Sequence, residues 1–333
     1  MADVALAAGV SAMTVSRALR ADSTVAPATR RHILKIVDRL GYVPDIQAQG
    51  LSLQRTGFIA ALVPSLNNPH FADTVRSLTE TLEPLGLQVL VGHTNYEVAR
   101  EETLITTLLR RRPEAIVLTD DNHSPAALKL LRKAGIPVVQ IWDWPQRPLQ
   151  HVVGFSNAEA TAAMVQYLAS RTYRRIVYVG ETNDAGSRGA RRREGYLKAI
   201  SELSLGPARL FNIAMPPVSM TQGRAAFSSI REQFPDADAI MCVSDPCAFG
   251  IMTEALAQGV RVPDDIALAG FGDFEISRCC SPSLTTVTVD AEQIGAQTGH
   301  LLSVLRQADG APGLSTPARV KLPFGIAARA STR

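Results

Sequence analysis

Apolar positions in the first part of the chain follow the spacing of three short helices. The first stretch repeats apolar side chains at helical intervals and ends at Gly9, a natural helix terminator. Ser11 can cap a second helix, while Pro27 stands at the tolerated first position of a third, which Gly41 closes. Such a trio is typical of a helix-turn-helix unit that binds DNA. The predicted helices cover residues 2–8, 12–20 and 27–40.

Beyond residue 57 the pattern changes to short apolar runs separated by helical stretches. Phe58–Val63 is an unbroken apolar run of the kind that parallel sheets bury on both faces. Alternating strands and helices predict βαβ units in two lobes, roughly 58–152 and 153–285, with 286–333 returning partly to the first lobe. Further predicted strands lie at 88–91, 115–118, 138–141, 176–179, 239–243 and 266–269.

Composition and charge separate the two parts of the chain. With 46% hydrophobic and 20% charged residues in 333, the chain is an ordinary globular protein rather than a disordered, collagenous or coiled-coil one. Residues 1–56 contain six Arg and one Lys against four Asp and no Glu, which accounts for the whole net charge of +3. A basic head suits phosphate contact and a neutral body suits a small-molecule binder.

The sequence also predicts where the protein resides. No window approaches the roughly 18 unbroken apolar residues of a membrane helix, and the N-terminus lacks a signal-peptide pattern. The four cysteines have no metal-type spacing, which favours reduced thiols that pack in the interior. We expect a cytoplasmic protein without a membrane partner, metal or cofactor.

Several short motifs, in their order and spacing, resemble the head of the lactose/galactose repressor family. They are Asp3-Val4-Ala5, Ala8-Gly9-Val10-Ser11, Thr14-Val15-Ser16-Arg17, Thr29-Arg30 and Gly41-Tyr42-Val43-Pro44. The resemblance continues through the body and covers essentially the whole chain. It implies a nucleoid-associated repressor of carbohydrate utilisation that binds double-stranded operator DNA as a homodimer and responds to a small sugar or sugar acid.

The resemblance divides the chain into three parts. Residues 1–44 are the helix-turn-helix DNA-binding domain, 45–57 the hinge helix and linker, and 58–333 the effector-binding and dimerisation domain. The fold class is therefore an all-α head plus an α/β, two-lobed, periplasmic-binding-protein-like body with parallel, doubly wound sheets. Family members usually carry several residues before the position of Met1, including a Thr that caps the first helix.

The resemblance assigns DNA contacts to the second helix and the hinge. Arg17 offers a bidentate fork to guanine, and Ala12 and Met13 offer apolar contacts to bases. Leu51 is the apolar wedge that enters the minor groove. Phosphate contacts fall to Thr14, Ser16 and Thr29.

The hinge helix itself is predicted to be marginal. Gly50 costs roughly 1 kcal/mol of helix stability relative to Ala. A helix this short orders only when DNA and a partner subunit support it, which makes the hinge a plausible switch element.

Most candidate effector residues stand where predicted strands end, at the edge where open sheets bind ligands. The His70-Phe71 loop can also be read as a capped helix start, Asp143 as part of an exposed turn, and Arg192 as part of a solvated arginine-rich helix face. Arg192 holds the family's effector-arginine place, three residues before a glycine. The candidates are His70, Phe71, Asp143, Arg192, Ser244 and Asp273.

One departure from the family concerns the ligand. Gly272 stands where members that bind neutral sugars or purines place an Asp, Asp273 comes next, and Val218 replaces an aromatic ring. An arginine kept beside a displaced acid favours a sugar acid, because a guanidinium pairs with a carboxylate through two hydrogen bonds. The His70-Phe71 loop, Val153–Asn157 and Gly270–Glu275 look like gluconate-utilisation repressors.

Three alternatives remain at this point. The same architecture could respond to a neutral sugar. A solute-binding protein would share the body fold but would carry a signal peptide in place of the head. A sugar-processing enzyme would need a catalytic motif, and the sequence has no G-x-G-x-x-G after a strand, no P-loop and no zinc signature, so we predict no catalytic residues.

The head supplies a first prediction. Because Arg17 is the one long basic side chain expected on the recognition face, Arg17→Ala should cost about 1–3 kcal/mol of operator affinity and much less affinity for random DNA. A gel-shift comparison of operator and random duplexes measures both. Equal losses on the two duplexes would show that Arg17 contacts only phosphate.

Overall fold

The computed structural model describes most of the chain, which divides into two units, Met1–Thr56 and Gly57–Arg333. No helix in the described part of the chain is long and apolar enough to cross a membrane. The described residues are 1–19, 24–42, 56–119, 122–181, 187–213, 216–307 and 316–333.

The first unit consists of α1 (Ala2–Ala8), α2 (Ala12–Ala18) and α3 (Pro27–Leu40). Gly9 and Gly41 end α1 and α3 in the left-handed conformation, with φ of 63° and 59°. The hydroxyl of Ser11 accepts a hydrogen bond from the Thr14 amide at 3.2 Å, as expected of a cap. The predicted stop signals and this cap are confirmed.

The second helix is shorter than predicted. It ends at Ala18 rather than Arg20, and the Ala18 carbonyl accepts a hydrogen bond from Nε of Arg30, on α3, at 3.0 Å. A side chain distant in sequence thus satisfies a carbonyl at the helix end. The three helices bury a small core around Val4, Val15 and Ile33, all with no exposed surface.

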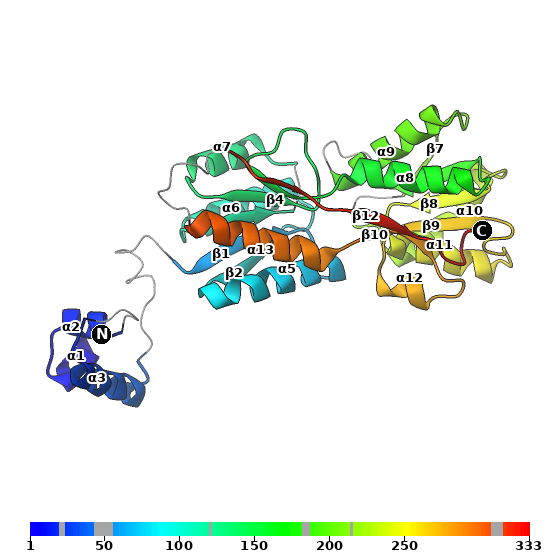
Figure 1. The fold of residues 1–333 in the computed structure, drawn as a ribbon. Coiled ribbons are helices and arrows are strands. Elements are labelled where there is room, and N and C mark those ends of the chain that lie inside the picture. The colour runs from blue at the N-terminus through cyan, green and yellow to red at the C-terminus, as the bar shows by residue number, and fades with distance from the viewer. Residues whose placement is uncertain (20–23, 43–55, 120–121, 182–186, 214–215, 308–315) are drawn as a thin grey trace. The chain divides into compact units, whose positions relative to one another are not determined.

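The second unit contains two six-stranded sheets in its described residues, each covered by helices (Figure 1). The first sheet has the strand order β11-β5-β4-β3-β1-β2, and all of its strands are parallel. Its elements are β1 (Phe58–Val63), α5 (Pro69–Leu82), η1 (Glu83–Leu85), β2 (Gln88–His93), α6 (Val98–Leu109), β3 (Ile116–Leu118), α7 (Pro125–Lys133), β4 (Val138–Ile141), β5 (His151–Gly154), α13 (Ala291–Gln307) and β11 (Arg319–Lys321).

The unbroken apolar run of β1 is explained by helices on both faces of this sheet. Ile59 and Val63 join the core cluster that contains residues of α5 and α13. Ala60 and Leu62 point to the opposite face and pack with residues of α6 and α7. A strand covered on both sides has no polar face, which is why its sequence does not alternate.

The second sheet has the strand order β12-β10-β9-β8-β6-β7. All of the predicted strands are present in one sheet or the other. The elements of the second lobe are α8 (Asn157–Ser170), β6 (Ile176–Gly180), α9 (Arg188–Glu202), β7 (Arg209–Asn212), α10 (Met220–Gln233), β8 (Ala239–Cys242), α11 (Asp245–Ala257), β9 (Ala267–Gly272), α12 (Glu275–Cys279), β10 (Thr285–Val289) and β12 (Phe324–Ala327).

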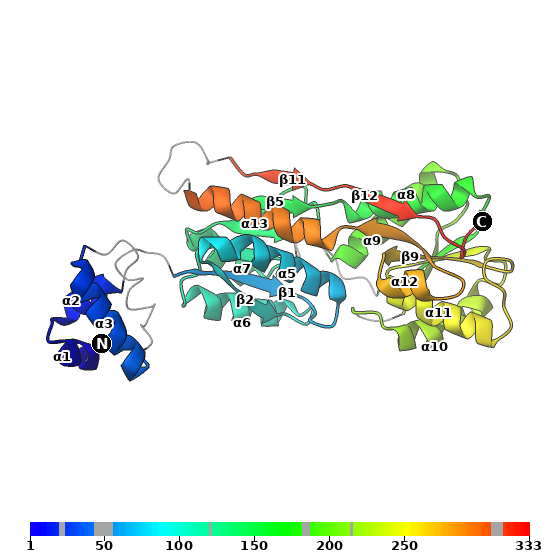
Figure 2. The same ribbon diagram turned by 60° about the horizontal axis from the view of Figure 1, so that its bottom comes forward.

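One strand departs from the expected parallel arrangement. β12 pairs antiparallel with β10, whereas β11, just before it in the chain, pairs parallel with β5. The chain runs straight from β11 into β12, as Figure 2 shows. Because the carboxyl edges of the two sheets face each other, a strand that leaves one sheet at that edge must enter the other sheet in the reverse direction.

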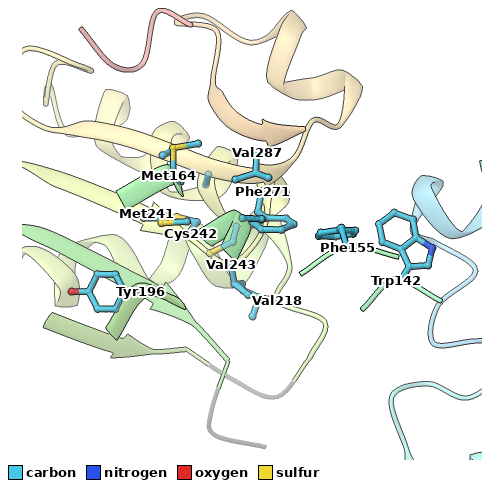
Figure 3. Packing of buried hydrophobic residues seen from close by; sticks show 14 of the residues in the cluster. Trp142, Phe155, Met164, Tyr196, Val218, Met241, Cys242, Val243, Phe271 and Val287 are labelled. Atoms are coloured by element: carbon cyan, nitrogen blue, oxygen red, sulfur yellow. The ribbon is translucent and has the colours of Figure 1, made fainter. Parts of the chain in front are cut away.

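The chain crosses between the lobes after β5, after β10 and between β11 and β12. Aromatic rings accompany the first crossing (Figure 3). The ring of Phe155 lies 6.1 Å from that of Trp142 in the first lobe and 6.3 Å from that of Phe271 in the second. These contacts join the interiors of the two lobes into one apolar cluster.

In the second lobe, α10 and α11 approach each other through glycines. A Cβ atom at Gly223 would overlap the carbonyl oxygen of Cys247, and one at Gly250 would overlap that of Met220. Main-chain atoms cannot move aside as a flexible side chain can, so both positions require glycine. The close approach fixes the relative positions of the two helix starts.

The contact between α10 and α11 predicts a stability effect. Gly250→Ala should lower the free energy of unfolding by about 1–3 kcal/mol, because the added methyl group forces the two backbones apart. Leu256→Ala, at an exposed position of the same helix, is the matched control and should change stability by less than about 0.5 kcal/mol. Urea denaturation of both variants measures the difference; equal values would show that the helices separate freely.

Candidate functional site

The exposed side of α2 carries the residues predicted to read DNA bases. Val15 and Ala18 face the core of the head with no exposed surface, which turns Ala12, Met13 and Arg17 outward. Met13 is 64% exposed, which is unusual for a large apolar side chain. This face therefore combines apolar groups with one guanidinium.

The predicted phosphate contacts occupy half-buried positions. Thr14, Ser16 and Thr29 are all partly accessible. The hydroxyl of Thr14 lies 2.9 Å from that of Ser11, so it takes part in the cap of α2. Leu51, the predicted minor-groove wedge, lies outside the described residues.

In the second unit, a cavity of about 470 Å³ is lined by residues from both lobes. The residues at the N-cap positions of several helices all contribute to its wall, because the helices that follow parallel strands begin at the same edge of a sheet. These N-cap residues are Asn68 of α5, Glu97 of α6, Ser187 of α9, Ser219 of α10 and Ser244 of α11.

Arg192 lines this cavity and is held by the protein on three sides. Its Nε donates to Oδ1 of Asn157 at 2.9 Å, and Nη1 donates to the carbonyl of Val243 at 2.6 Å. The guanidinium carbon lies 3.7 Å from the centre of the Phe271 ring. Burial, with a smaller contribution from neighbouring Arg188, lowers the pKa of Arg192 to about 10, so the group stays charged at neutral pH.

Arg188, four residues earlier on the same helix, also lines the cavity. Its side chain is buried, and its guanidinium carbon lies 4.9 Å from the centre of the Phe71 ring. Phe71 belongs to α5 in the first lobe and is itself part of the cavity wall. The pair is a cation–π contact between the lobes.

Carboxylates line other parts of the cavity. Glu97 and Glu101 come from the first lobe and Glu181 from the second. Glu101 is buried and its Oε1 lies 2.7 Å from Nδ1 of His123. Cationic and anionic groups therefore line the same cavity.

Of the residues predicted to bind an effector, Phe71, Arg192 and Ser244 line the cavity. His70, Asp143 and Asp273 are not among the described residues that form its wall. His70 instead packs its ring against Phe274, 4.3 Å between ring centres, and burial lowers its pKa to about 4, which leaves the ring neutral at pH 7.

Asp143 contacts Asn157 and is not among the described residues of the cavity wall. Its carboxylate is buried and Oδ1 accepts a hydrogen bond from Nδ2 of Asn157 at 3.0 Å. Burial raises the pKa of this carboxyl group, while the hydrogen bond from Asn157 opposes that shift. Asp143 thus contacts the residue that holds Arg192.

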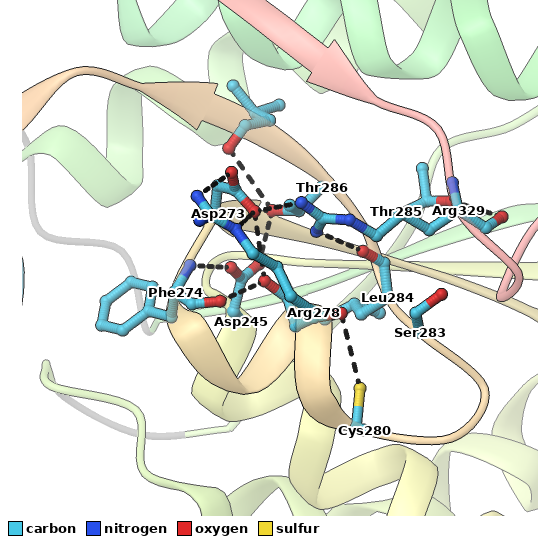
Figure 4. Close-up of polar contacts among 12 residues, drawn as sticks. Asp245, Asp273, Phe274, Arg278, Cys280, Ser283, Leu284, Thr285, Thr286 and Arg329 are labelled. Atoms are coloured by element: carbon cyan, nitrogen blue, oxygen red, sulfur yellow. Dashed lines mark hydrogen bonds and ion pairs between the residues drawn. The ribbon is translucent and has the colours of Figure 1, made fainter.

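Asp273 is occupied by ion pairs (Figure 4). Its carboxylate lies 2.7 Å from Nη2 of Arg278 and 2.5 Å from Nη2 of Arg329. Burial by itself would raise the pKa of Asp273, but the hydrogen bonds from the two arginines outweigh it and lower the pKa. Both oxygens of Asp273 thus face arginines, and Asp273 is not among the described residues of the cavity wall.

Sequence reasoning missed Arg188 and the acidic residues of the first lobe. The spacing of Arg188 and Arg192 was the available signal, because residues four apart share one face of a helix. Glu97 and Glu101 carried no comparable signal, since an acidic residue at a helix start is usually only a favourable surface charge. Among the described residues, no group of three His, Cys, Asp or Glu side chains could hold a metal ion.

Comparisons with known protein families match nearly the whole chain. The family described as bacterial regulatory proteins, lacI family, matches residues 1–45. The family described as periplasmic binding proteins and sugar binding domain of LacI family matches residues 56–314. The HTH-type transcriptional regulator GntR of Escherichia coli strain K12 is 33% identical over 294 residues, which cover 88% of each chain.

Solved structures resemble the chain as well. A LacI family transcriptional regulator from Silicibacter pomeroyi is 44% identical and superposes with a TM-score of 0.79, covering 83% of this chain and 99% of its own. The Lac repressor dimer bound to operator and an anti-inducer has a TM-score of 0.84 at 24% identity over 99% and 98% of the chains, a likeness of fold alone. The predicted fold class is confirmed, and with these matches over both units the chain belongs to the LacI family of bacterial transcriptional regulators, which are not enzymes.

Proposed function

We propose that this regulator is a repressor of carbohydrate utilisation whose effector is a sugar acid, gluconate or a close relative. The observation that carries the proposal is a pair of guanidiniums on the cavity wall, those of the buried Arg188 and the half-buried Arg192. A carboxylate can accept two parallel hydrogen bonds from one guanidinium, and charge-assisted bonds of this kind are roughly twice as strong as neutral ones. The hydroxyls of a neutral sugar can also accept hydrogen bonds from a guanidinium, but they carry no negative charge to strengthen them.

The helix starts around the cavity add to this preference. Each helix N-terminus carries a partial positive charge equivalent to roughly half an elementary charge, and its free amides point outward. Helices α5, α6, α9, α10 and α11 all begin at the cavity wall. The combined field favours an anion over a neutral molecule of the same shape.

The remaining polar groups suit the hydroxyls of such an acid. Ser244 and Asn67 offer both donors and acceptors, and Glu181 offers acceptors. The cavity volume of about 470 Å³ is ample for a six-carbon acid. Two segments in which the sequence resembles gluconate-utilisation repressors, the His70-Phe71 loop and Val153–Asn157, contribute Phe71 to the wall and Asn157 to the support of Arg192.

In the DNA-binding part, we propose that residues 1–44 read the operator, 45–57 form the hinge and 58–333 bind effector and partner subunit. The exposed Ala12, Met13 and Arg17 support base contact, with Thr14, Ser16 and Thr29 on phosphates and Leu51 in the minor groove. Two copies would bind a palindromic operator as a symmetric dimer. The site of action would be the nucleoid in the cytoplasm.

A neutral sugar is a second candidate effector. The carboxylates of Glu97, Glu101 and Glu181 on the cavity wall favour it, because acids that accept hydrogen bonds from hydroxyls are common in sugar sites. A solute-binding protein and an enzyme lose their support once the family is known. The choice therefore lies between ligands, and binding measurements distinguish them.

The first prediction compares ligands. Calorimetry on the purified protein should show that gluconate binds at least about tenfold more tightly than glucose. Arg188→Gln should weaken gluconate binding about tenfold and should change the affinity for glucose little. Arg191→Gln, which removes a neighbouring arginine outside the cavity wall, is the matched control. Clear heat with glucose and none with gluconate would select the neutral-sugar alternative.

The second prediction concerns regulation. Closure of the lobes around the ligand should shift the two subunits against their hinge helices, so gluconate should weaken operator binding. Fluorescence anisotropy with a labelled operator duplex, at zero and saturating gluconate, measures the change. Unchanged or tighter operator binding with bound gluconate would retain the effector site and refute induction.

A further inference from the structure

Asn157 occupies the point where the chain passes from the first lobe into the second. It is the first residue of α8, and it is completely buried. Its side-chain Oδ1 accepts from Nε of Arg192 at 2.9 Å. Its Nδ2 donates to Oδ1 of Asp143 at 3.0 Å and to the carbonyl of Trp142 at 2.9 Å.

The neighbours of this amide permit only one orientation. A guanidinium can only donate hydrogen bonds, whereas a carbonyl and an ionised carboxylate can only accept them. The amide oxygen must therefore face Arg192 and the amide nitrogen must face Trp142 and Asp143. In a flipped amide, the NH2 group would face the N–H of Arg192 and the oxygen would face the oxygens of Trp142 and Asp143. The buried groups would then lack hydrogen-bond partners, which is costly.

The main chain on the first-lobe side of this link is tightly constrained. Trp142 has a φ of 70°, in the left-handed region that bulky residues rarely adopt. A Cβ atom at Gly154 would overlap the carbonyl oxygen of Asp143, so the segment after β4 meets the end of β5 closely here. Asn157 is thus anchored to a segment that cannot shift independently.

On the second-lobe side, the same amide determines how Arg192 faces the cavity. Of the five N–H donors of the guanidinium, Asn157 takes the one on Nε and Val243 takes one on Nη1. With the Phe271 ring against one face, the plane and rotation of the group are fixed. Donors on the outer edge of the group remain for a ligand.

We propose that Asn157 is a positioning residue, which orients Arg192 for the anionic group of the effector and links that arginine to Trp142 and Asp143 of the first lobe. This inference rests on the proposed effector site. An anion that attracts Arg192 pulls on its hydrogen bond to Asn157. Because Asn157 lies where the chain passes between the lobes, the pull is transmitted to that segment. A neutral ligand exerts no such force on the guanidinium.

A double-mutant cycle tests the positioning role. Asn157→Leu should weaken gluconate binding about tenfold, the scale of one lost hydrogen bond to a charged group. In an Arg192→Leu background the same substitution should weaken binding by less than about twofold, because its effect passes through the arginine. Thr298→Val, at another buried position whose hydroxyl bonds only within its own helix, controls for general destabilisation and should leave gluconate binding unchanged.

The outcomes separate this inference from the proposed function. Equal losses from Asn157→Leu in both backgrounds would mean that the residue acts through the fold, which overturns the positioning role and keeps the effector site. Unchanged gluconate binding by Asn157→Leu, together with strongly weakened gluconate binding by Arg192→Leu, would likewise overturn the positioning role and keep the effector site. Unchanged gluconate binding in Arg192→Leu would refute the effector site itself, and the positioning role with it.

Asp143 provides a test by conservative replacement. Asp143→Ala removes the acceptor that orients the amide, whereas Asp143→Asn can turn its own carbonyl oxygen toward Asn157. Both variants remove the same charge, so a purely electrostatic role predicts equal gluconate affinities. The positioning role predicts that the Asn variant binds gluconate more tightly than the Ala variant, and calorimetry on the two full-length proteins decides.

Discussion

The second unit depends on one geometric constraint: two sheets, parallel except for β12, present the carboxyl edges of their parallel strands to the same cavity. Every helix that follows a strand at such an edge begins there, so the amide-bearing ends of α5, α6, α9, α10 and α11 converge. The backbone amides at these helix starts therefore contribute a positive electrostatic potential in the cavity whichever side chains line it. The arginines of α9 strengthen it, and the glycine contacts between α10 and α11 hold two of the helix starts in place.

A charged group at this depth needs support from the protein. Burial lowers the pKa of Arg192 to about 10, which still leaves the guanidinium charged at neutral pH. Hydrogen bonds to Asn157 and the Val243 carbonyl replace lost water contacts, and the Phe271 ring supplies a cation–π contact. Arg188 is held differently, against Phe71 of the opposite lobe. Both arginines thus connect the cavity to the contacts between the lobes.

Much of the fold could be predicted from the sequence because local patterns carried it. Gly9, Pro27 and Gly41 mark helix ends through their backbone preferences, and Ser11 does so through its side-chain cap. Buried strands such as Phe58–Val63 are recognisable because both faces are apolar. The reversed direction of β12 was not predictable in this way. It follows from the straight passage of the chain between two facing sheets, which no local pattern records.

Some residues of the candidate site were likewise predictable from the sequence, and others were placed only by the tertiary structure. Phe71, Arg192 and Ser244 were predictable because they stand at strand ends or helix starts on the cavity edge, or hold a recognised family position. By itself, the sequence determined the two-part architecture and the chemistry available. Only the tertiary structure decided that Arg329 pairs with Asp273, and that Asn157 stands between Asp143 and Arg192. Those partners are distant along the chain, and a side chain's orientation is set by whichever complementary group the fold places beside it.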